Sequence, residues 1–178
     1  MLHFIVLIFG FTGILGKLIS LEAERLVFWR VFIGGILVML WLMLRNKTVK
    51  FKPKTAVQVG LVGCVAAAHW IAFFAAIKVS NVSIALATLA TTPLFVSFIE
   101  PLVHRRKLDW REMVLGLAIL LGLLVLLMGP KMVSGEFTLE AQAYYAGIGL
   151  ALISAFLAAV FSTLNSVLVR QYDAANLT

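Results

Sequence analysis

The sequence predicts an all-α integral membrane protein, a bundle of six helices that each cross a bilayer. Of its 178 residues, 62% are hydrophobic and only 13% are charged, whereas about a quarter of a soluble domain is charged. The apolar residues lie in six long blocks, which lack the period-two alternation of a membrane β-barrel. A helix of ~20 residues crosses the ~30 Å of hydrocarbon. This composition excludes a water-soluble fold and a disordered chain.

The apolar blocks set the expected order of elements along the chain. Spans are expected at residues 2–19, 26–44, 55–77, 82–103, 113–128 and 144–169. The fourth should kink at Pro93, because proline has no backbone N–H and presses on the preceding turn. The longest gap, residues 129–143, contains Gly129, Pro130 and Gly135. We expect it to be a loop on the outer side and the boundary between two units.

The positive charge of the chain reflects membrane orientation. A formal net charge of +7 is also typical of nucleic-acid binding, but these charges lie in the connections between apolar blocks. The connections after the second, fourth and sixth spans hold ten Lys and Arg residues, and the other connections hold three. Basic residues concentrate on the cytoplasmic side. We therefore expect a multi-pass protein of the cell (inner) membrane with a cytoplasmic N-terminus, in contact with the lipid bilayer and with no nucleic acid.

Catalysis and metal binding have little support in the sequence. The one cysteine, Cys64, lies inside an apolar block, so neither a disulfide framework nor a paired-cysteine metal site is expected. No zinc-binding helix motif, nucleophile elbow or phosphate-binding glycine loop is present. His104 and Asp109 match an acyltransferase spacing, but a two-residue match is common by chance. We therefore expect that the protein is not an enzyme and that it binds neither a metal nor a cofactor.

Two cations lie within the expected spans, where a charge costs ~2.5–3.5 kcal/mol at a helix centre. Lys17 can extend to the interface or pair with one of the two glutamates at 22 and 24. Arg30 lies about one turn inside the second span, and Gly34 and Gly35 follow it. Because glycines allow helices to approach closely, this part of the second span is expected to be packed. There the Arg30 guanidinium could meet an anionic group of a substrate.

The third and fourth spans hold the other candidates. Small residues recur every four positions in the third span and predict a ridge for helix contact, at Gly60, Cys64, Ala68, Ala72 and Ala76. His69 and Trp70 lie near its middle, where a histidine serves either in packing or in a cavity. Thr88, Thr91 and Thr92 share one face of the fourth span. Their hydroxyls either bond the carbonyls freed by Pro93 or face a cavity, and both roles can hold together.

These residues form the predicted site. The cavity is expected to be lined by side chains from the second, third and fourth spans: Arg30, His69, Trp70, Thr88 and Thr92. Lys17 is a further candidate, and Pro93 shapes the broken helix. Glu100, near the inner end of the fourth span, should pair with the basic residues at 104–107.

Five stretches together resemble a known family. They lie at residues 14–17, 28–32, 81–87, 92–95 and 110–116, and the last follows a basic turn. Their order and spacing resemble those of the EamA-type carriers of the drug/metabolite transporter superfamily. The resemblance implies ten helices in two five-helix repeats of inverted topology, with a substrate path between them.

On that basis, residues 1–128 would be the first repeat and residues 129–143 an outer loop. Residues 144–178 would hold the opening helix of a second, incomplete repeat. The implied function is a carrier that moves, and most simply exports, small metabolites or drugs by alternating access. The alternative is a non-transporting membrane scaffold or assembly subunit. A chain of only six helices would have to form a homodimer to complete a path.

Overall fold

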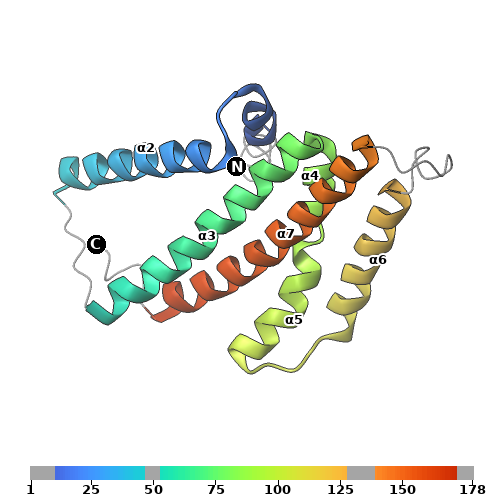
Figure 1. The fold of residues 1–178 in the computed structure, drawn as a ribbon. Helices are drawn as coiled ribbons and strands as arrows, with labels where there is room; N and C mark the ends of the chain where they lie inside the picture. Colours follow the sequence, from blue (N-terminus) through green and yellow to red (C-terminus); the bar gives the residue numbers. More distant parts are fainter. Residues whose placement is uncertain (1–10, 47–52, 128–138, 172–178) are drawn as a thin grey trace.

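The fold is entirely helical, as the sequence predicts. The computed structural model describes residues 11–46, 53–127 and 139–171, among which no strand occurs (Figure 1). Residues 11–18 are helical. The later helices are α2 (Ala23–Leu44), α3 (Pro53–Val79), α4 (Val82–Leu89), α5 (Thr92–His104), α6 (Trp110–Leu127) and α7 (Leu139–Gln171).

The helix bounds agree with the expected spans within a few residues. Four stretches of the described chain are long and apolar enough to cross a membrane: Ala23–Leu44, Pro53–Val79, Val82–His104 and Gln142–Arg170. Helix α6 contains the described part of the expected fifth span. Half of the expected first span, residues 2–10, and residues 129–138 of the expected outer loop lie outside the described residues. The rest of that loop, residues 139–143, was predicted wrongly, because α7 begins at Leu139 and its apolar pattern extends by more than one helical turn before residue 144.

Helices α3 and α7 run antiparallel and side by side through the centre of the molecule (Figure 1). On α7, a small residue at every fourth position is buried, namely Gly147, Ala151, Ala155 and Ala159. A side chain at Gly147 would overlap Ser80, which follows α3. Helix α7 also contacts α4 and α5. The helix expected to open a second repeat is therefore a central element of the described structure.

The small-residue ridge predicted on α3 is only half correct. Ala72 and Ala76 are buried, but Gly60, Cys64 and Ala68 are exposed. Within the described part of the chain, nothing outside the adjoining helix backbone lies within 4 Å of the Cβ position of Gly60. Helix α3 instead buries residues spaced seven apart, which is two helical turns: Thr55, Val62, His69 and Ala76. The ridge of small residues that brings the two backbones together lies on α7.

The expected break in the fourth span lies between α4 and α5. Helix α4 ends at Leu89 and α5 begins at Thr92, immediately before Pro93. The hydroxyl of Thr92 donates to the Leu89 carbonyl (2.6 Å), and that of Thr91 donates to the Thr88 carbonyl (2.7 Å). The hydroxyls thus bond carbonyls that the interrupted helix leaves with fewer backbone donors.

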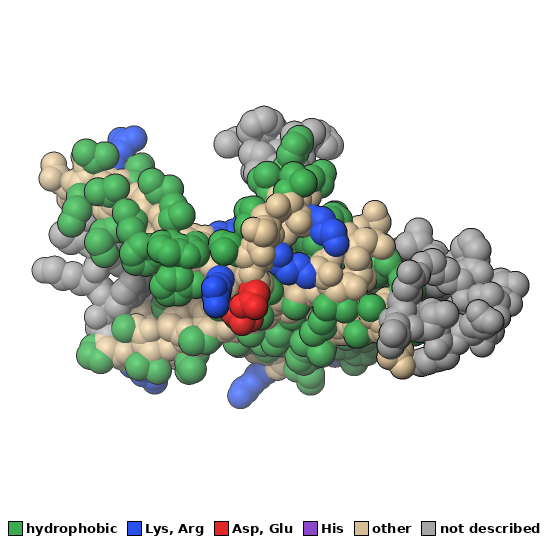
Figure 2. Space-filling view, turned by 45° about the horizontal axis from the view of Figure 1, so that its top comes forward, with side chains coloured by type: hydrophobic (Ala, Val, Ile, Leu, Met, Phe, Trp, Pro, Cys, Tyr) green, Lys and Arg blue, Asp and Glu red, His purple; other side chains and the backbone are tan. Residues whose placement is uncertain are grey.

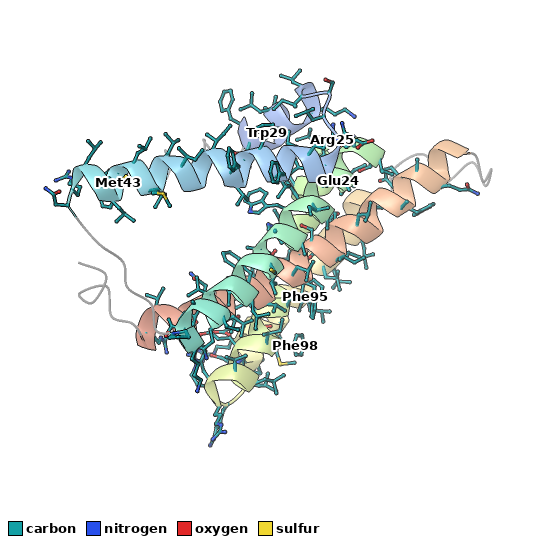
Figure 3. All side chains as sticks on the ribbon, turned by 60° about the vertical axis from the view of Figure 1, so that its left-hand side comes forward. Glu24, Arg25, Trp29, Met43, Phe95 and Phe98 are labelled. Carbon is teal, nitrogen blue, oxygen red and sulfur yellow. The ribbon has the colours of Figure 1, made fainter. Side chains whose placement is uncertain are left out.

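Among the described residues, α2 packs against the rest of the molecule through its first half. Its buried residues are Ala23, Leu26 and Val27, and its far end, at Met43, projects away from α3 (Figure 3). No other atom lies within 4 Å of a side chain built at Gly34 or Gly35. The predicted close packing at these glycines is therefore wrong among the described residues, because α2 diverges from α3 after their crossing.

The C-terminal end of α5 bonds to α7 and to the loop that leads to α6. Glu100 forms an ion pair with Arg106, as the sequence predicts. His104 Nε2 lies 3.0 Å from Ser166 Oγ on α7. Because the Ser166 hydroxyl donates to the Thr163 carbonyl (2.7 Å), it accepts the hydrogen bond from His104.

Candidate functional site

A cavity of about 340 Å³ lies between residues 12–21, the first half of α2 and the second half of α3. Leu15, Leu26 and Phe74 contribute to its apolar walls, and the charged side chain of its lining is Arg30. Gly16 makes the close approach of these segments feasible, because any side chain there would overlap the ring of Phe74. The absence of a side chain at this position helps to shape the cavity.

Arg30 lies against the aromatic residues of α3. Its guanidinium carbon is 4.2 Å from the centre of the Trp70 ring and 6.0 Å from that of Phe74. A cation over an aromatic face gains about 0.5–2 kcal/mol. Among the described residues, Arg30 has no ion pair with a carboxylate and no hydrogen bond. Since stacking occupies one face of the guanidinium, its N–H donors remain available at the edge.

The charged side chains around the Arg30 cavity are mainly positive (Figure 2). Lys78 Nζ donates to the carbonyl of Ile19 (2.9 Å), and Ile19 lines the cavity. Glu22 pairs with Arg25 at 3.5 Å, with both side chains exposed. Lys17 is exposed, and it forms no ion pair with either glutamate that the sequence offered as its partner.

His69 joins α3 to α7. Its Nδ1 lies 2.9 Å from the Ser154 carbonyl and 3.0 Å from the Ser154 hydroxyl, and that hydroxyl donates to the His69 carbonyl (3.2 Å). Both side chains are buried. The network is satisfied when Nδ1 carries a proton and donates to the Ser154 carbonyl. The geometry of His69 is therefore that of a link between helices.

Thr88 and Thr92, the two threonines of the predicted site, do not line the Arg30 cavity. Thr88 is fully buried on α4, and its hydroxyl has no hydrogen-bond partner among the described residues. Thr92 is half-buried, with its hydroxyl bonded to Leu89. The structure therefore brings together Arg30 and Trp70 from the predicted set. It places His69 beside Trp70, with ring centres 5.0 Å apart.

Several cavity residues were not predicted from the sequence. Leu26, Trp29 and Ile33 line the cavity with Arg30 on α2. Leu26 and Ile33 could have been found from their spacing, four residues before Arg30 and three after it, whereas Trp29 directly precedes Arg30. Trp29 lies near the crossing with α3 (Figure 3). Phe74 gave no signal, because an aromatic residue in an apolar block is ordinary.

The link between His69 and Ser154 is expected to stabilise the fold. His69→Phe should lower the free energy of unfolding by about 1 kcal/mol, the scale of hydrogen bonds between membrane helices, because it removes the Nδ1 donor from the Ser154 carbonyl. The measurement is the free energy of unfolding in mixed micelles. As a control, Ser162→Ala should change this free energy by no more than about 0.5 kcal/mol, because the exposed Ser162 hydroxyl bonds within α7, to the Ala159 carbonyl. Equal losses in the two variants would contradict the link.

The comparison with known proteins agrees with the helical architecture. A family model described as the EamA-like transporter family matches residues 1–128. No curated protein and no solved structure matches the chain significantly. The matched residues are well over half of the chain and include α2 to α6. The chain therefore belongs to the EamA-like transporter family, whose members are membrane transporters of the drug/metabolite transporter kind.

Proposed function

We propose that this protein is a carrier that exports small metabolites or drugs by alternating access, with the Arg30 cavity in its solute path. The family match and the apolar helices support a membrane transporter. The observation that carries the solute site is Arg30 itself, a cation that lines a cavity and has no carboxylate partner among the described residues. A charge in a membrane helix is costly and usually serves a function.

The proposed organisation follows the family. Residues 1–128 form a first five-helix repeat, supported by a family match that ends at residue 128. Helix α7, which begins at Leu139, would then be the opening helix of a second repeat of inverted topology. The bias of basic residues supports an inner-membrane protein with a cytoplasmic N-terminus.

The predicted site residues then divide by role. In this proposal Arg30 contacts the solute, Trp70 supports the Arg30 guanidinium, and Lys17 lies on a neighbouring exposed surface. His69 and Thr88 act in the packing of α3 and α4 against α7, and Thr92 satisfies the helix break before Pro93. We propose neither a metal nor a cofactor.

Export should depend on the charge of Arg30. Cells that express the chain are expected to release at least one metabolite faster than cells that express Arg30→Gln, by about tenfold, because a charge-assisted hydrogen bond to the solute is lost. Mass spectrometry of the medium measures the difference. Arg25→Gln is the matched control, since Arg25 lies on the same helix and pairs with exposed Glu22. Identical profiles for wild type and Arg30→Gln would contradict the solute site.

A further inference from the structure

We infer that the Arg30 cavity binds a small organic acid, with its carboxylate at Arg30 and a flat apolar body against the walls. This inference rests on the proposed function only in treating the ligand as a transported solute. It depends on four features of the cavity: the donors of Arg30, the chemistry of the walls, the volume and the surrounding charges.

The Arg30 guanidinium is arranged to receive an anion. Its stacking 4.2 Å above Trp70 holds the plane of the group, and the N–H groups at the edge form a fork that matches the two oxygens of a carboxylate. No described carboxylate occupies that fork. A donor group that is already held in place loses less conformational entropy when the ligand binds.

The walls suit an apolar body of one or two rings. Apart from Arg30 and Thr12, the lining is hydrophobic or glycine, and it includes Leu26 and Trp29 of α2 and Phe74 of α3. The volume is about 340 Å³, and a dry apolar cavity of about 150 Å³ already accommodates benzene. A hydrophilic anion such as inorganic phosphate would leave these walls unused.

The surrounding charges favour an anion over a cation. Lys78 donates a hydrogen bond to the Ile19 carbonyl in the cavity lining, and Glu22 forms an ion pair with Arg25. Glu24 borders a separate groove on the other side of α2, together with Phe28 and Ile71. No described carboxylate lines the Arg30 cavity, so a cationic ligand would face Arg30 without compensation.

An anionic phospholipid has the same chemistry, since it joins a phosphate to apolar chains. The test therefore uses the whole chain in nanodiscs of phosphatidylcholine, with and without phosphatidylglycerol. The probe is tritiated 2-naphthoate, measured by equilibrium dialysis against empty nanodiscs, which correct for partition into lipid. 2-Naphthamide and 2-naphthylmethylammonium are its neutral and cationic counterparts. The variants are Arg30→Gln and Arg30→Lys, with Arg25→Gln as the matched control.

Wild type and Arg25→Gln should bind 2-naphthoate at least about tenfold more tightly than 2-naphthamide, and the ammonium compound most weakly. Arg30→Gln should lose this preference, and Arg30→Lys should retain part of it, because lysine keeps the charge without the fork. The wild-type ligand series remains decisive even if a variant fails to fold. Equal affinities in wild type, or a preference unchanged in folded Arg30→Gln, would overturn the inference.

The remaining outcomes separate the inference from the carrier proposal. Saturable binding of naphthoate with no Arg30-dependent export would support this site and count against the carrier. Arg30-dependent export with binding indifferent to ligand charge would overturn the inference alone. If phosphatidylglycerol stabilises wild type but not Arg30→Gln, and naphthoate does not bind, the occupant is a lipid and the inference is wrong.

Discussion

The substitution Ala151→Leu is expected to destabilise the folded protein by about 3 kcal/mol, the upper end of the usual cost of overpacking. Ala151 is fully buried on α7, in a cluster with Phe73 and Ala76 of α3. The three added heavy atoms have no free space between the two backbones, so α7 would have to move away from α3. The free energy of unfolding in mixed micelles, followed by circular dichroism, measures the loss.

The same substitution at Ala146 is the control. Ala146 is exposed on the same helix, five residues earlier, so Ala146→Leu should change stability by no more than about 0.5 kcal/mol. Equal losses for the two variants would mean that leucine disturbs α7 in general. The close contact between α3 and α7 would then be contradicted.

The second large effect is expected at Gly116 on α6. A methyl group there would lie 2.7 Å from Leu94 Cδ1 and 2.9 Å from Leu94 Cα on α5. Because the backbone of α5 cannot rotate away as a side chain can, α5 and α6 would separate. Gly116→Ala should cost about 1–3 kcal/mol, despite the ~1 kcal/mol that alanine adds in helix propensity.

Gly122 provides a matched control on the same helix. Among the described residues, nothing outside the adjoining backbone of α6 lies within 4 Å of an added methyl group at this position. Gly122→Ala should therefore leave the free energy of unfolding unchanged or raise it slightly. Loss of stability in both variants, measured in the same micelles, would contradict the contact between α5 and α6.

The helix bounds could be predicted because hydrophobic length is a local property of the chain. Residues 55–77 were expected as a span, and α3 runs from Pro53 to Val79. Which face of a helix is packed depends on distant segments. Gly34 and Gly35 therefore gave a wrong prediction, and the ridge on α7 was missed although the spacing of its small residues is regular.

In the candidate site, too, local features could be predicted from the sequence, whereas contacts between distant segments could not. Arg30 could be identified because a charge within an apolar span is conspicuous. Its contact with Trp70, 40 positions along the chain, depends on where α2 crosses α3. His69 was recognised as polar and central, but its partner Ser154 is 85 residues away. The choice between a cavity and a packing role required that contact.

The packing indicates which parts of the molecule are expected to move. Helix α7 is joined to α3 by close backbone contact and by the bond between His69 and Ser154. In contrast, α2 buries only three residues, near its beginning. In an alternating-access cycle, we expect α3 and α7 to move together, and the cavity to open and close by movement of α2 and residues 11–18 against them.

Access to the cavity from both sides of the membrane is the central requirement of this account. The measurement uses Ile33→Cys, which lines the cavity, in a Cys64→Ala background that removes the one native cysteine. A membrane-impermeant maleimide is applied to intact cells and to inverted vesicles. The lipid-facing control is Val38→Cys, because Val38 is exposed on α2 away from the cavity. Alternating access through this cavity predicts labelling of Ile33→Cys from both sides and of Val38→Cys from neither. Labelling of Ile33→Cys from only one side would contradict a carrier that uses this cavity.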